Sequence, residues 1–106
     1  MHQEVYADKE NQLMTKAKSF MKDSSDNREI EISLQIFEKL ESFHTQNSVY
    51  RNPKTLVDIL NNIACCYRRI NSLDPAIEVL NRALKISKSN NLNSGLTYTN
   101  LSAIYS

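Results

Sequence analysis

The sequence predicts an all-α protein made of antiparallel helix pairs, and both its composition and its periodicity support that fold class. The 106-residue chain contains one Gly and two Pro, whereas β proteins need many tight turns that draw on both residue types. Apolar residues recur at three- and four-residue steps, which is the spacing of one face of an α-helix. The length fits one small domain over 1–106.

Two helices are predicted within residues 1–45, at 3–22 and 27–43. The stretch "DSSDNRE" (23–29) between them offers short polar side chains that can cap a helix N-terminus. We expect "HTQNSVYRN" (44–52) to form a loop, since its Ser, Asn and Thr compete with helical hydrogen bonds. The apolar stripes of the two helices contain Leu13, Met14, Ala17, Phe20, Met21, Ile30, Leu34, Phe37 and Leu40.

A third helix is predicted to begin sharply at Pro53 and to run to about Ile70. Asn52 can cap it, and Pro suits the first helical position because no amide partner is needed there. By the same reasoning Asp74 caps a fourth helix that starts at Pro75.

A fifth helix is predicted over 94–106, and it repeats the pattern of the third. A shift of 38 residues superimposes similar types, namely Asn62 on Asn100, Ile63 on Leu101, Cys66 on Ile104 and Tyr67 on Tyr105. Helix pairs that recur at such a period are typical of a helical solenoid.

The stretch "LNNIACCYRRINSLDPAIEVLNRALKI" (60–86) resembles a tetratricopeptide repeat. Its first helix has the large, small and aromatic residues of that family's helix A, and its second has the small residues of helix B. The matching positions are Leu60, Ile63, Ala64, Tyr67, Ala76, Leu80 and Ala83. The family's usual Gly between the two helices is replaced by Asn71, which tolerates left-handed backbone.

The resemblance implies a short tetratricopeptide-like solenoid of about two and a half repeats. Residues 1–45 would be a degenerate helix pair, 52–90 the clearest repeat, and 94–106 the first helix of an incomplete repeat. The sequence pattern of residues 55–67 is also similar to that of the longer-period repeats of kinesin light chains. Leu101, Ile104 and Tyr105 would then lack a covering helix, so we expect a longer protein or a partner that covers this end.

In the tetratricopeptide family, helix A residues line a concave groove that binds peptides or helices of partner proteins. The positions that match this groove are Asp58, Asn62, Cys65, Arg69 and Asn100. The first four follow at steps of four, three and four, so they share one helix face. For the asparagines, the alternative is hydrogen bonding within the helix pair or to water, and for Arg69 it is an ordinary charge at a helix end.

The two adjacent cysteines do not form a metal or disulfide unit. Neighbouring residues on a helix point about 100° apart, so they cannot chelate one ion together. We expect Cys66 to be a small buried residue and Cys65 to face the groove. Their number and adjacency favour an intracellular, reducing compartment.

Other functional classes have little support in the sequence. The net charge is +1, which is not the basic footprint of a nucleic-acid-binding domain, although "YRR" and "NPK" could touch phosphate. His2 and His44 have no metal-ligand partners at helical spacing, and His44 is expected near the carbonyls of a helix end. We expect no enzyme activity, no cofactor, no metal and no membrane span.

Two functional hypotheses remain, and both place the protein in the cytoplasm. The first is a non-catalytic interaction module that binds a partner peptide or helix in the groove. The second is a structural subunit of a large cytoskeletal, motor or ciliary assembly, which stacks through its ends and its outer helix faces.

Overall fold

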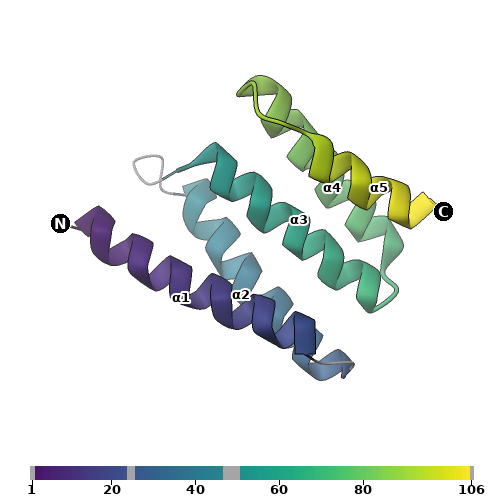
Figure 1. The fold of residues 1–106 in the computed structure, drawn as a ribbon, viewed down its shortest axis with the longest axis horizontal. Coiled ribbons are helices and arrows are strands. Elements are labelled where there is room, and N and C mark those ends of the chain that lie inside the picture. The colour runs from purple at the N-terminus through teal and green to yellow at the C-terminus, as the bar shows by residue number, and fades with distance from the viewer. Residues whose placement is uncertain (1, 24–25, 47–50, 106) are drawn as a thin grey trace.

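The computed structural model describes residues 2–23, 26–46 and 51–105, and nearly all of them belong to α-helices (Figure 1). No strand occurs in these residues, so the predicted all-α class is confirmed. In chain order the helices are α1 (His2–Asp23), α2 (Asn27–Gln46), α3 (Pro53–Arg69), α4 (Leu73–Ser89) and α5 (Gly95–Tyr105).

Successive helices run in opposite directions, so α1, α3 and α5 share one direction while α2 and α4 return (Figure 1). α3 lies at the centre and contacts α2, α4 and α5, whereas α1 packs on α2 and α5 also packs on α4. The resulting layered body measures 43 × 31 × 19 Å, with α1 at one end and α5 at the other. This arrangement is compatible with a helical repeat.

One continuous apolar core runs through the helices. Leu80 of α4 is fully buried, and Ala76 and Ala83 on either side of it are also fully buried. Small side chains allow two helices to approach closely, and burying a leucine contributes about 2 kcal/mol. Of the predicted stripes of the first two helices, Ile30, Leu34, Phe37 and Leu40 are buried, while Leu13 is 41% exposed. The repeat-matching residues Leu60 and Ile63 are buried as well.

A small residue also marks the closest approach of α1 and α2. Ser33 and Ala17 are both fully buried, and the Ser33 hydroxyl donates to the Ala17 carbonyl oxygen at 2.9 Å. The serine thus meets the need of a buried hydroxyl for a partner while keeping the volume small.

The predicted start of α3 is confirmed. Asn52 has extended backbone, and its side-chain oxygen accepts from the amides of Lys54 and Thr55 at 3.1 and 3.3 Å. Pro53 occupies the first turn, where an amide hydrogen would have no helical partner. At the start of α2, Asp26 accepts from the Arg28 amide in a similar way at 2.9 Å.

The loop predicted over 44–52 is wrong in its first part, because α2 continues through Gln46. Thr45 donates its hydroxyl to the Glu41 carbonyl one turn earlier. Arg51 folds back and donates to the carbonyl oxygens of His44 and Thr45, which satisfies two free acceptors at the helix end. Residues 47–50 of this prediction lie outside the described residues.

The predicted cap at Asp74 is also wrong, because α4 begins at Leu73 with Ser72 as its cap residue. The Ser72 carbonyl accepts from the Ala76 amide and so closes the first turn. Asp74 lies inside that turn, where a carboxylate is still favourable beside the free amides.

Asn71 adopts left-handed backbone with φ of 63°, as expected from its place between α3 and α4. Asn91, just after α4, does the same with φ of 55°. Each reverses the chain at a helix end where glycine is the commoner residue.

Candidate functional site

The candidate face of α3 contains four of the five predicted groove residues. Asp58, Asn62 and Cys65 are half-buried, and Arg69 is exposed. They occupy successive turns of one helix, and this helix lies between α1 and α5. α1 and α5 run in the same direction as α3 (Figure 1), and side-chain contacts with both helices place this face between them as a polar strip.

On one side, the strip is tied to α1. Lys18 lies 3.4 Å from the Asp58 carboxylate, and both side chains are about half exposed. The Arg69 guanidinium donates to the carbonyl oxygen of Met21 near the end of α1. Asp58 and Arg69 thus hold α1 beside α3 and also remain partly open to solvent.

On the other side, the strip meets α5 through amides. The Asn100 amide nitrogen donates to the side-chain oxygen of Asn61 at 2.8 Å. The Cys65 sulfur lies 4.0 Å from the Asn100 side-chain oxygen, at the limit for a thiol hydrogen bond. The structure therefore brings Cys65 and Asn100 together, whereas the 38-residue shift had matched Asn100 with Asn62.

Asn61 is a central residue that the sequence analysis missed. It is 2% exposed, and its amide nitrogen donates to the Val57 carbonyl at 2.9 Å and to the Thr97 hydroxyl at 3.0 Å. With its oxygen accepting from Asn100, each of its polar atoms has a partner. A signal was present, because Val57 and Ala64 place Asn61 on a third buried stripe of the helix.

Asn62 differs from its neighbour, since its amide bonds within its own helix. The nitrogen donates to the Asp58 carbonyl at 2.8 Å and lies 3.5 Å from the Asp58 carboxylate. Within the described residues its side-chain oxygen has no partner. The predicted pair of asparagines is thus unequal: Asn62 offers a hydrogen-bond acceptor, and Asn100 is held between two helices.

The two cysteines have different surroundings, as expected. Cys66 is fully buried and belongs to the core, whereas Cys65 is half-buried on the strip. Burial raises the pKa of the Cys66 thiol to about 12. Burial also raises the pKa of Cys65, although the nearby Arg68 opposes that shift. Both groups are therefore neutral thiols near pH 7.

His44 lies in the last turn of α2, as expected, and it is buried there. Its Nδ1 accepts from the Asn52 amide at 3.3 Å, so in the neutral ring Nε2 carries the proton. Nε2 lies 2.6 Å from a Glu10 carboxylate oxygen and donates to it. His44 thus joins α1, α2 and the cap of α3 at one point, which is a structural role.

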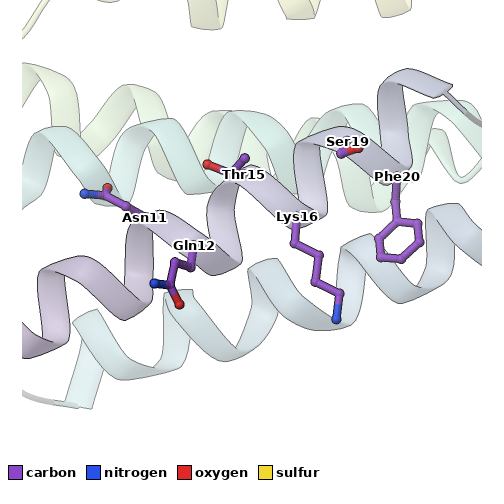
Figure 2. Close-up of a pocket in the computed structure, with 6 residues that line it drawn as sticks. All are labelled: Asn11, Gln12, Thr15, Lys16, Ser19 and Phe20. Atoms are coloured by element: carbon purple, nitrogen blue, oxygen red, sulfur yellow. The ribbon is translucent and has the colours of Figure 1, made fainter.

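Two hollows in the described part of the surface offer no convergent chemistry. One lies along α1 and is lined by Asn11, Gln12, Thr15, Lys16, Ser19 and Phe20 (Figure 2). All six side chains come from a single helix, so no second element closes over a ligand there. Another hollow contains Arg51 and Arg82, but the first bonds to carbonyls of α2 and the second pairs with Glu41.

Comparisons with known proteins leave the family open. No protein-family model matches the chain, and neither curated proteins nor solved structures yield a match. Among the described residues, no three His, Cys, Asp or Glu side chains cluster as metal ligands. No helix in the same residues is long and apolar enough to cross a bilayer.

Proposed function

We propose that this chain is a non-catalytic protein–protein interaction module that resembles tetratricopeptide repeats. It binds a peptide or helix of a partner along the strip formed by Asp58, Asn62, Cys65 and Arg69, with Asn100 at its edge. The observation that supports this proposal is the position of the strip between α1 and α5, with the open acceptor of Asn62 at its centre.

The chemistry of the strip suits a polypeptide ligand. A free amide oxygen accepts from backbone amides without regard to side chains, and so tolerates many sequences. Asp58 and Arg69 carry opposite charges at the two ends of the strip and can fix the direction of a bound segment. Both are partly exposed, so each contributes more to orientation than to affinity.

The alternative function is a subunit that stacks through its ends in a larger assembly, cytoskeletal, motor or ciliary. Leu96, Tyr98 and Tyr105 support it, because these large side chains are exposed on α5 at one end of the body. Leu101 and Ile104 are half-buried against the core, so the packed side of α5 is already covered.

The groove is tested with Asn62→Ala and a matched control, Asn81→Ala, on the exposed surface of α4. Peptides that bind the protein are selected from a random displayed library, and their Kd values are measured by fluorescence anisotropy. Asn62→Ala should weaken binding roughly tenfold, equal to one lost hydrogen bond. Alanine favours helix, so the fold should be kept.

A second readout uses Cys65 as a reporter in a Cys66→Ala background. A bound peptide should slow the reaction of Cys65 with a maleimide, because the thiol lies on the strip. The proposal that peptides bind along this strip would be contradicted if Asn62→Ala and Asn81→Ala bound the peptides with equal affinity and the bound peptide did not slow the reaction of Cys65 with maleimide. Loss of binding in Glu78→Lys on the outer face of α4 would instead favour the alternative.

A further inference from the structure

The buried ring of His44 has a polar partner on each of its two nitrogens. The side chain lies in the last turn of α2 and is 1% exposed. Nε2 lies 2.6 Å from a carboxylate oxygen of Glu10 on α1. Nδ1 lies 3.3 Å from the backbone nitrogen of Asn52, the residue that caps α3. A single ring therefore bonds both to α1 and to the start of α3.

The bond to Asn52 fixes the tautomer of the neutral ring. A backbone amide can only donate, so Nδ1 accepts and carries no proton. The one proton of the neutral ring is then on Nε2, which donates it to the Glu10 carboxylate. In this state each nitrogen of His44 has the kind of partner that it needs.

A second proton changes the two sides of the ring in opposite ways. Histidine takes up this proton between about pH 8 and about pH 5, whereas free carboxylates take up theirs at lower pH. At Nε2 the bond to Glu10 remains and becomes an ion pair, which is strong away from water. At Nδ1 the new N–H faces the N–H of Asn52. Two donors then meet, and their hydrogen bond is lost.

Charged groups around His44 leave the protonated ring with a partner in place. Glu10 of α1 supplies the opposite charge, and it is itself buried. Arg51 carries a like charge, but it is exposed and donates to backbone carbonyls at the end of α2, so water screens its effect on the ring. Glu41, one turn earlier on α2, is paired with Arg82 of α4.

We propose that His44 makes the contact between α2 and the start of α3 sensitive to pH. In neutral solution the ring holds α1, α2 and the cap of α3 together. In mildly acidic solution the protonated ring keeps Glu10 and releases the amide of Asn52. Arg51 still bonds to the end of α2 by groups that do not titrate in this range, so the release is local and reversible. None of these residues belongs to the α3 strip, so the inference is independent of the peptide groove.

Nuclear magnetic resonance of the 15N-labelled chain from about pH 7.5 to about pH 5 tests the proposal. The ring nitrogens of His44 should show a proton on Nε2 alone at the neutral end and on both nitrogens at the acidic end. The Asn52 amide should shift with the same midpoint, and its protection from hydrogen exchange should fall about tenfold, the loss of one hydrogen bond. The Lys54 amide, which donates to the Asn52 side chain, is the internal control and should keep its protection.

Two substitutions separate the two bonds of the ring. His44→Asn has a side-chain oxygen that can accept from Asn52 in place of Nδ1 and does not titrate, so the transition should disappear. Glu10→Gln keeps an acceptor for Nε2 without its charge, so the midpoint should move to lower pH. The chain has two histidines, and the matched control His2→Gln should leave the transition unchanged.

Circular dichroism verifies that each variant keeps its helices, and the titration of the wild type decides alone for any variant that does not. The proposal is overturned if Nδ1 carries a proton at neutral pH, or if the Asn52 amide keeps its shift and protection when the ring is protonated. It is equally overturned if His44→Asn retains the transition, if Glu10→Gln leaves the midpoint in place, or if His2→Gln removes the transition.

Discussion

α3 makes two different contacts with the helices that follow it. Against α4 the contact is apolar, with Leu60 and Leu80 fully buried and Ala76 and Ala83 allowing close approach. Against α5 the centre of the contact is polar, with the Asn61 amide bonded to Thr97 and Asn100. The same helix therefore presents an apolar face to one neighbour and an amide to the other.

The two contacts have different roles: the apolar contact mainly stabilises the fold, and the polar contact mainly fixes how the two helices are aligned. Apolar burial supplies most of the free energy of folding but tolerates small displacements between helices. A buried amide tolerates no such displacement, because each hydrogen bond that is lost leaves a buried polar group without a partner. We therefore expect α3 and α4 to form the most stable part of the protein, and α5 to be positioned accurately but held less strongly.

The largest expected effect tests the apolar contact. Leu80→Ala should lower the free energy of unfolding by about 3 kcal/mol, because it removes buried methyl groups and leaves a cavity. Urea denaturation measures this loss. Leu73→Ala on the same helix is the control, since Leu73 is 38% exposed and should cost under about 1 kcal/mol. Similar losses for both variants would contradict an apolar core at this contact.

The next effect tests the polar contact with two adjacent asparagines. Asn61→Ala should cost about 2 kcal/mol, because the buried Thr97 hydroxyl and the half-buried Asn100 amide lose their partner. Asn62→Ala should be nearly neutral, since it removes only a bond within its own helix. Hydrogen exchange should become faster in α5 for the first variant alone. If Asn61→Ala increased exchange equally in α3 and α4, the α3–α5 contact would not be independent of the α3–α4 contact.

A third effect appears only at alkaline pH. The unfolded thiol ionises near 9.0 and the folded Cys66 thiol near 12, so the folded state holds its proton more tightly. The contribution of the protonated Cys66 thiol to the free energy of unfolding is complete below pH 9 and is lost as the pH rises from 9 towards 12. Cys66→Ala lacks it, so the stability gap between wild type and variant should narrow between pH 8 and pH 10.5 in urea titrations. A constant gap would show that Cys66 titrates like an unfolded thiol.

The smallest effect concerns the contact between α1 and α3. Lys18→Ala should cost under about 0.5 kcal/mol, because an ion pair between exposed groups gains little in water. The loss should vanish in high salt, and Lys16→Ala is the matched control on the same helix. A loss above about 1 kcal/mol that persists in salt would mean that α1 depends on this pair.

The sequence predicts the helices well because their apolar periodicity is local. Pro53 with Asn52, and Asn71 with its left-handed backbone, are as expected because each depends on its own dihedral angles and nearest amides. The end of α2 was predicted too early, because the burial of His44 and the carbonyl contacts of Arg51 are tertiary.

The candidate site was predicted less completely. Asp58, Asn62, Cys65 and Arg69 share the expected face, since helical spacing alone determines that. Asn61 was missed, because its partners lie 36 and 39 residues away and only the packing of α5 brings them close. Whether the strip binds a partner stays a prediction.

The amide of Asn61 also limits how the chain can change in length. Thr97 and Asn100 must both face this amide. One residue inserted between them would rotate one of the two by about 100° and break its hydrogen bond to Asn61. An insertion in the turn at 90–94 would leave that spacing intact, at a small cost in chain entropy. Insertions and deletions near the end of this chain should therefore be tolerated in the turn before α5 and rejected inside the first two turns of the helix.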